Sequence, residues 1–225
     1  MKHIVFVPLK EEYEDVSVRS SELNSYLNPS PYEFTNTDSR AECMSVGDMI
    51  HEIAQYTMLM WEDKWHECVD KHIAEVKANW PYEREKEYEW FLWAAHQYVE
   101  LVKHLRCSYI EQKRTTIIEY SWYKVTFSWT SDCDIDMYTM YDIKSAWSKW
   151  SEDKAKSERQ KYYYAWLKNI RQWTENDTKF KYIILTKQKK PQIQEFDFII
   201  SFKEAEKYVK ADLKVYLTWL FLSKK

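Results

Sequence analysis

Residues 131–145 read Ser-Asp-Cys-Asp-Ile-Asp-Met-Tyr-Thr-Met-Tyr-Asp-Ile-Lys-Ser. An acidic residue ends one β-like run, a short polar turn follows, and a second apolar run leads to Asp142 and Lys144. Because side chains alternate along a strand, Asp142 and Lys144 share one face. Asp134, at the end of the neighbouring strand, is expected to meet Asp142 across the ladder. Two carboxylates and an ammonium group at a strand end can form a site for a hard cation such as Mg²⁺ or Mn²⁺.

The same short pattern is also common on solvated hairpins, so the rest of the chain has to support this interpretation. The chain has 225 residues, of which 45% are hydrophobic, which excludes a disordered protein. Its net charge of −3 gives no overall attraction to nucleic acid, so binding to DNA requires a local basic surface. The single glycine excludes glycine-rich phosphate loops. The four cysteines lack the spacing of a zinc site or a disulfide framework.

The periodicity of apolar residues predicts long helices over about 47–79 and 83–107, separated by Pro81. The period then changes to that of strands. The remaining expected elements are a short strand within 1–15, a short helix after Ser20 or Ser21, strands over 115–120, 124–129 and 137–144, a helix over 153–174, strands over 180–186 and 192–200, and a helix over 202–222.

This order predicts one domain over residues 1–225. A helical elaboration covers about 47–107, a core covers about 113–200, and a C-terminal helix covers about 202–222. No apolar run of membrane-spanning length and no secretory signal is evident, so a cytoplasmic protein is expected.

Three further features accompany the opening stretch. The first is the only glycine, Gly47, four residues before His51 at the expected start of a helix, where the backbone needs a close approach or an unusual dihedral angle. The second is Glu119, which is equally compatible with an exposed edge carboxylate. The third is the pair Gln160 and Tyr164, one helical turn apart. Each of these residues, taken alone, also fits an ordinary structural role.

The order and spacing of these features resemble those of the PD-(D/E)xK nuclease superfamily, and within it the RecB-like exonuclease branch. The branch pattern G-x-x-x-H, G-x-x-D, D-x-K, Q-x-x-x-Y is matched by Gly47 to His51, Ser131 to Asp134, Asp142 to Lys144, and Gln160 to Tyr164. Segments 21–27 and 30–34 also look like the opening of that branch, so the resemblance covers roughly residues 17–170. Ser131 replaces the usual glycine, which leaves Asp132 and Asp136 open as alternatives to Asp134.

The resemblance implies an α/β fold with a restriction-endonuclease-like core, a central mixed β-sheet flanked by helices, and a helical N-terminal elaboration. It implies that Asp134, Asp142 and Lys144 are catalytic. The implied metal ligands are His51, Asp134, Asp142 and the Ile143 backbone carbonyl, with Glu119 as a weaker candidate. Gln160 and Tyr164 would position the substrate. The cofactor would be Mg²⁺ or Mn²⁺, and without the cysteines of the cluster-bearing members no iron–sulfur cluster is expected.

The implied activity is hydrolysis of DNA, by an exonuclease acting on ends or single strands in recombination, repair or phage replication. A partner protein from these processes is then also expected. The alternatives are a structure-specific endonuclease and a non-catalytic nucleic-acid-binding module. Basic and aromatic residues that follow the active strand could contact phosphates and unpaired bases: Lys149, Lys154, Arg159, Lys161, Trp147 and Trp150.

Overall fold

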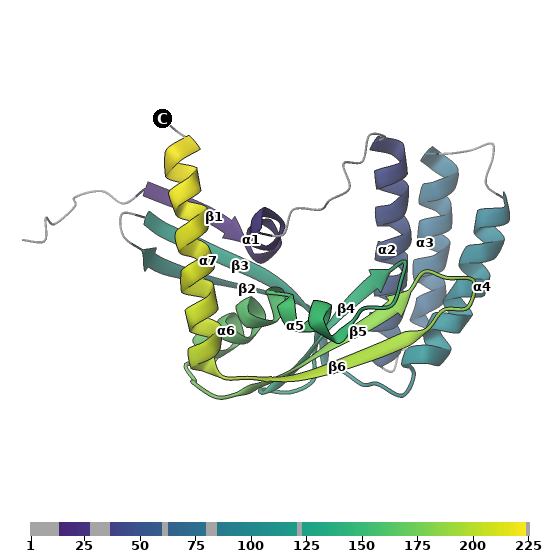
Figure 1. Cartoon of the computed structure of the whole chain (residues 1–225). Helices are drawn as coiled ribbons and strands as arrows, with labels where there is room; N and C mark the ends of the chain where they lie inside the picture. The colour runs from purple at the N-terminus through teal and green to yellow at the C-terminus, as the bar shows by residue number, and fades with distance from the viewer. Residues whose placement is uncertain (1–13, 28–36, 60–62, 80–84, 121–122, 224–225) are drawn as a thin grey trace, which may run out of the picture.

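The computed structural model describes residues 14–27, 37–59, 63–79, 85–120 and 123–223. A six-stranded mixed sheet runs through the molecule with helices on both of its faces (Figure 1). The predicted α/β class, with a mixed sheet flanked by helices, is confirmed. Most of the strand expected within residues 1–15, and the segment 30–34, lie outside the described residues. Within the described part of the chain, no helix has both the length and the apolar character that crossing a membrane requires.

The central strand of the sheet is β3. One edge of β3 pairs with antiparallel β2, whereas the other edge is shared by parallel β1 and antiparallel β4. On that shared edge β1 pairs with residues 123–128 and β4 pairs with residues 133–134, which leaves a gap at residues 129–132. Beyond β4 follow parallel β5 and antiparallel β6. The strands are β1 (Glu14–Arg19), β2 (Tyr109–Tyr120), β3 (Tyr123–Asp134), β4 (Thr139–Ala146), β5 (Thr178–Thr186) and β6 (Ile193–Ile200).

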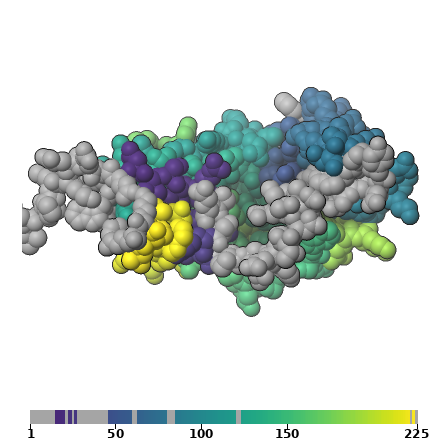
Figure 2. All heavy atoms as spheres, turned by 90° about the horizontal axis from the view of Figure 1, so that it is seen from above, coloured from purple at the N-terminus to yellow at the C-terminus, as the bar shows by residue number. Residues whose placement is uncertain are grey.

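The helices form two groups at opposite ends of an elongated molecule. Helices α2, α3 and α4 stand side by side over the end of the sheet formed by β4 and β5, whereas α6 and α7 lie toward the other end (Figure 1). A view from above shows α3 and α4 (blue) and α7 (yellow) well separated (Figure 2). The helices are α1 (Ser20–Leu27), α2 (Thr37–Met58), α3 (Lys64–Asn79), α4 (Glu85–Val102), α5 (Glu152–Ser157), α6 (Gln160–Gln172) and α7 (Phe202–Ser223).

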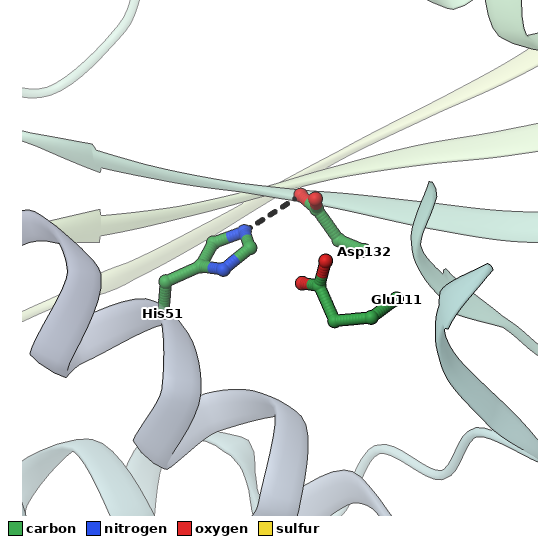
Figure 3. Close-up of side chains that lie close together, drawn as sticks. All are labelled: His51, Glu111 and Asp132. Carbon is green, nitrogen blue, oxygen red and sulfur yellow. Dashed lines mark ion pairs between the residues drawn. The ribbon is translucent and has the colours of Figure 1, made fainter. Parts of the chain in front are cut away.

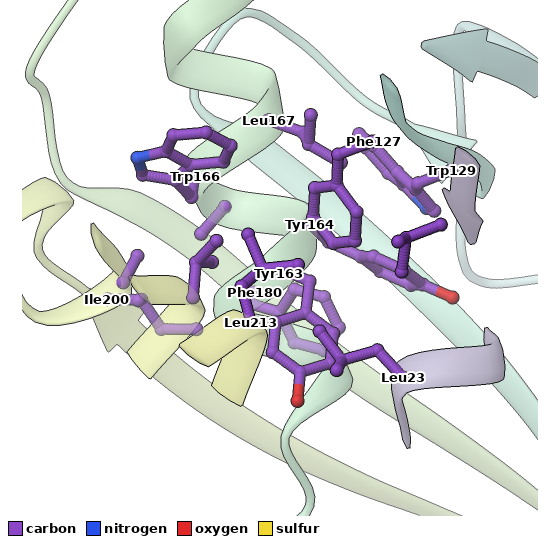
Figure 4. Packing of buried hydrophobic residues seen from close by; sticks show 14 of the residues in the cluster. Leu23, Phe127, Trp129, Tyr163, Tyr164, Trp166, Leu167, Phe180, Ile200 and Leu213 are labelled. Atoms are coloured by element: carbon purple, nitrogen blue, oxygen red, sulfur yellow. The ribbon is translucent and has the colours of Figure 1, made fainter. Parts of the chain in front are cut away.

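Each group of helices covers its own hydrophobic core. Phe127 and Trp166 belong to the core between the sheet and helices α6 and α7 (Figure 4). Ile53 and Tyr98 belong to the core beneath α2, α3 and α4. The hydroxyl of Tyr98 also donates a hydrogen bond to the carbonyl of Thr186 at 2.9 Å, which fixes α4 against β5. On β5 the two cores lie on opposite faces of the sheet, because Tyr182 and Ile184 belong to the first core and Ile183 and Leu185 to the second.

The single helix expected over 47–79 is wrong, because it is divided into α2 and α3, and α2 begins ten residues earlier, at Thr37. The carbonyl of Met58, at the end of α2, accepts a hydrogen bond from the N–H of Cys107 at 3.0 Å. Folding the two helices back on each other lets both apolar faces pack against α4, which one straight helix could not do.

The helix expected over 153–174 is likewise divided, into α5 and α6. Glu158 adopts an extended backbone with φ −62° and ψ 125°, which ends α5. The buried ammonium group of Lys161 donates to the carbonyls of Ala155 at 3.1 Å and Lys156 at 2.7 Å, and also to that of Glu158. These contacts satisfy carbonyl groups that the end of the helix leaves without partners.

Candidate functional site

The carboxylate opposite Asp142 is that of Asp132. The register of β3 and β4 places Asp134 opposite Met140, so continuing the ladder by two residues on each strand places Asp132 opposite Asp142. The N–H of Ile143 donates to Asp132 Oδ2 at 2.7 Å. A side chain thus replaces the main-chain partner where β4 separates from β3. The expected meeting of Asp134 with Asp142 is therefore wrong by two residues.

Asp134 turns instead toward α6. Its carboxylate forms an ion pair with Arg114 and another, at 3.2 Å, with Lys168, and it accepts a hydrogen bond from Ser131 Oγ at 3.2 Å. Asp134 and Lys168 are both buried. Burying the Lys168 ammonium group is costly unless a counter-charge accompanies it, so this arrangement gives Asp134 a structural role.

Two other candidate carboxylates also lie elsewhere. Asp136 Oδ1 accepts hydrogen bonds from the N–H groups of Tyr138 and Thr139, both at 2.7 Å, within the turn before β4. Glu119 is exposed and stands opposite Lys124 at the far end of β2. Between residues 111 and 119 that strand extends for roughly 26 Å. The structure therefore does not bring Glu119 to the carboxylates of Asp132 and Asp142.

His51, Glu111 and Asp132 form a compact cluster at the gap (Figure 3). Each offers one ligand atom, and these atoms all lie within 4.8 Å of one another. His51 reaches the cluster from α2, and its Nε2 lies 2.9 Å from Asp132 Oδ2. One helical turn later, Gln55 Nε2 donates to Glu111 Oε1 at 2.6 Å and holds that carboxylate in place. An imidazole and two carboxylates are a donor set that divalent cations accept.

Glu111 is the residue that the sequence interpretation missed. The expected strand began at residue 115, whereas β2 begins at Tyr109 and carries Glu111 opposite Asp132 in the same register. Glu111 adopts a left-handed φ of 52°. A non-glycine residue in this conformation costs about 1–3 kcal/mol and persists only where its surroundings enforce it. Extending the hairpin register back from residue 115 would have indicated its position.

Asp142 and Lys144 complete the site from β4. Asp142 is fully buried, and its Oδ2 lies 2.8 Å from Lys144 Nζ. Apart from Lys144, no group in the described residues donates to either oxygen of this carboxylate. A buried side-chain oxygen normally has at least one hydrogen-bond partner, and Asp142 Oδ1 has none in the described residues. Asp142 therefore has unused ligand capacity at the edge of the cluster formed by His51, Glu111 and Asp132.

The surroundings of Asp142 and Asp132 shift their pKa values in opposite directions. Burial, and then the charge of Asp132, raise the pKa of Asp142 to about 7, although Lys144 opposes this shift. Burial would also raise the pKa of Asp132, but the charge and hydrogen bond of His51 outweigh it and lower that pKa below its usual value. The pKa values of His51 and Lys144 are raised, because the charges of the carboxylates outweigh burial. Neighbouring carboxylates whose pKa values are shifted in opposite directions are typical of functional sites.

Gly47 lets α2 approach the sheet closely. A Cβ atom at this position would lie 3.2 Å from Ser145 Oγ on β4. The expectation that the only glycine marks a close approach is thereby confirmed. Because His51 follows one turn later on the same helix, this contact sets the height of the imidazole above Asp132.

Gln160 and Tyr164 lie on α6, both buried, with Gln160 at the first position of the helix. The ring of Tyr164 stacks on Trp129, with 4.6 Å between the ring centroids. Burial raises the pKa of Tyr164, and the charges of Asp142 and Asp132 raise it further. The phenol of Tyr164 therefore lies within electrostatic reach of Asp142 and Asp132.

The residues expected to contact nucleic acid divide into two groups. Trp147 is 65% exposed and Lys149 is also exposed. The ammonium group of Lys154 lies 4.6 Å from the ring centroid of the partly buried Trp150. These four residues lie on or next to the segment that follows β4, at an accessible surface.

The other two cations are used within the fold. Arg159 lies 3.6 Å from Asp212 and stacks over Tyr208 at 4.4 Å. Lys161 is buried against the carbonyls that end α5. The structure therefore does not present Lys161 to a ligand at the surface.

Comparison with solved structures finds proteins of weak structural similarity. A candidate exonuclease from Eubacterium rectale is 18% identical, with a TM-score of 0.42 over 72% of this chain and 66% of that chain. The protein SSO0001 is 14% identical, with a TM-score of 0.38 over 93% of this chain and 79% of that chain. Rai1 from Scheffersomyces stipitis is 8% identical, with a TM-score of 0.26 over 85% of this chain and 60% of that chain.

This chain thus spans slightly less than two thirds of the Eubacterium rectale protein. No protein-family model matches the chain, and no curated protein matches it either. All three TM-scores lie below 0.5, so the functional assignment rests on the residues of the site itself.

Proposed function

We propose that this protein is a divalent-metal-dependent nuclease that hydrolyses phosphodiester bonds in DNA. The observation that supports this most is the buried carboxylate of Asp142, which lies 2.8 Å from Lys144 and has no other donor among the described residues. It stands opposite Asp132. A carboxylate with a purely structural role would find all its hydrogen-bond partners within the protein, and Asp134 is an example.

The metal would be held by His51, Glu111, Asp132 and Asp142. The sequence resemblance adds the Ile143 carbonyl to this set. The ligand atoms of the first three already lie within 4.8 Å of one another, which fits one divalent ion. When bound, the ion would polarise the phosphodiester and lower the pKa of a coordinated water molecule. The mixed imidazole and carboxylate set suits Mn²⁺ at least as well as Mg²⁺.

Lys144 and the α6 residues would act on the substrate directly. The pKa of Lys144 is raised by Asp142 and Asp132 despite burial, so its ammonium group stays charged. A fixed positive charge beside the reacting phosphate offsets the negative charge that develops on its oxygens. Gln160 and Tyr164 would hold the nucleotide, as the resemblance implies.

The expected mode of action is that of an exonuclease on linear ends or single strands, in recombination, repair or phage replication. This preference comes from the sequence resemblance. A structure-specific endonuclease would use the same residues, and a non-catalytic DNA-binding module would have no need of the incompletely paired Asp142.

The test incubates the protein with end-labelled linear DNA and with circular DNA, single- and double-stranded, with Mg²⁺ or Mn²⁺. We expect linear DNA to be degraded and the Asp142→Ala and Lys144→Ala variants to be inactive. Cutting of circular DNA would assign an endonuclease. Metal-independent binding without cleavage by the wild type would overturn the assignment as a nuclease.

A further inference from the structure

We infer that a pocket next to the carboxylates binds a backbone phosphate of the substrate strand, adjacent to the phosphate that is cleaved. This inference rests on the proposed function and deepens it. It predicts that the substrate is a polynucleotide strand read over at least two phosphates.

The pocket has a volume of about 420 Å³ and lies over the part of β3 that precedes Asp132. Its floor includes Ser128 and Thr130. Arg19, at the end of β1, and Lys113, on β2, line it from the two strands that flank β3. The pocket therefore adjoins the gap left where β1 ends and β4 has not yet begun to pair.

Its lining has the chemistry of an anion site. Two cations contribute, and the lining that the structure describes includes no carboxylate. Ser128, Thr130 and Tyr164 add hydroxyl groups. Ser20 also lines the pocket and is the first residue of α1, so the positive end of that helix dipole lies at the pocket. Cations from two strands together with several hydroxyl groups favour a phosphate over a neutral ligand.

Tyr164 and strand β3 link the pocket to the carboxylates of Asp132 and Asp142. Tyr164 lines the pocket, and the charges of Asp142 and Asp132 both act on its phenol. Thr130 precedes Asp132 by two residues on β3, which corresponds to about 7 Å along a strand. Successive phosphates of an extended nucleic-acid strand are separated by a similar distance. A strand with one phosphate at Asp132 and Asp142 can thus place its neighbour between Arg19 and Lys113.

The experiment measures binding and cleavage separately. Binding of a fluorescent single-stranded oligonucleotide is followed by anisotropy in the presence of a chelator, over a series of salt concentrations. The variants are Lys113→Met, Lys113→Arg and the matched control Lys124→Met, which removes the same charge from an exposed site elsewhere on the sheet. We expect Lys113→Met to weaken binding about tenfold, which is the order of one charge-assisted hydrogen bond. The slope of log K against log salt should shrink by about 0.7.

Lys113→Arg should retain most of the affinity, and Lys124→Met should bind like the wild type. In the presence of metal, the ratio of kcat/KM for the oligonucleotide to that for bis(p-nitrophenyl) phosphate should fall in Lys113→Met, because the small diester has no second phosphate. Equal binding by Lys113→Met and Lys124→Met would overturn the inference. A wild type that cleaves neither substrate would contradict the proposed nuclease, while the chelator arm would still decide on the pocket.

Discussion

Asp132 and Asp134 are both aspartates and lie only two residues apart, yet they have different neighbours and therefore different roles. Asp132 lies beside His51 with its pKa lowered, whereas Asp134 lies between Arg114 and Lys168. Strand alternation nominally places residues 132 and 134 on one face, so the sequence could predict an acidic pair there without deciding between them. The register of β4 decides, and that register depends on contacts distant in the sequence.

Exchanging each aspartate for asparagine tests this assignment. Asp132→Asn should reduce metal-dependent cleavage by about a hundredfold or more, the order seen when one group that stabilises the transition state is lost. Asp134→Asn should lower the free energy of unfolding by about 3 kcal/mol, because it leaves Arg114 and Lys168 without their counter-charge. Urea denaturation and a nuclease assay at a temperature where both variants are folded give the two readouts. The reverse pattern, with cleavage lost only in Asp134→Asn, would restore the assignment made from sequence.

At the scale of elements, the strands of the core were predictable and the helix breaks were not. Period-two runs of β-branched and aromatic residues indicated β2 to β6, although β2 and β3 extend further than the runs suggested. The break between α2 and α3 has no glycine or proline in the described residues around it, so the periodicity continued across it. The break between α5 and α6 depends on Lys161 reaching carbonyls of the preceding turn, which a composition pattern does not reveal.

The packing of α2 against β4 provides an element-scale prediction. Gly47→Ala should lower metal affinity and activity several-fold, because a Cβ atom 3.2 Å from Ser145 Oγ pushes the helix, and with it His51, away from the sheet. In a Ser145→Ala background the same change should instead stabilise the protein by up to about 1 kcal/mol, the difference in helix propensity between glycine and alanine. A double-mutant cycle of thermal denaturation and metal titration measures the coupling. Additive effects would show that the contact does not position α2.

At the scale of the whole molecule, the site joins the two ends of the protein. His51, Glu111 and Asp132 come from α2, β2 and β3, so the helical group and the sheet both contribute. With a net charge of −3, the proposed attraction to DNA would have to be local, at the lysine and tryptophan residues after β4 and at the pocket flanked by Arg19 and Lys113.

A metal ion bound across these elements should therefore stabilise the fold. At a concentration one hundred times Kd, the ion adds about 2.7 kcal/mol, which corresponds to roughly 5–10 °C in Tm for a chain of this length. Differential scanning fluorimetry with Mn²⁺, with Mg²⁺ and with a chelator measures the shift. Asp142→Ala should show little of it, whereas the control variant Lys124→Met should show all of it. A shift that Asp142→Ala retains in full would place the ion elsewhere.

The short pairing of β3 with β4 has a consequence for how the protein responds to heat. In the described residues, backbone pairing joins these strands only at Cys133 and Asp134, and just beyond these rungs lie the two facing aspartates. Local opening takes place where backbone pairing is sparse, at a lower free energy than unfolding of a packed core. Local opening of this short β3–β4 pairing would separate Asp132 from Asp142 while both cores remain intact. The proposed cleavage activity would then decrease on warming, at temperatures where the helices and the outer strands are still folded.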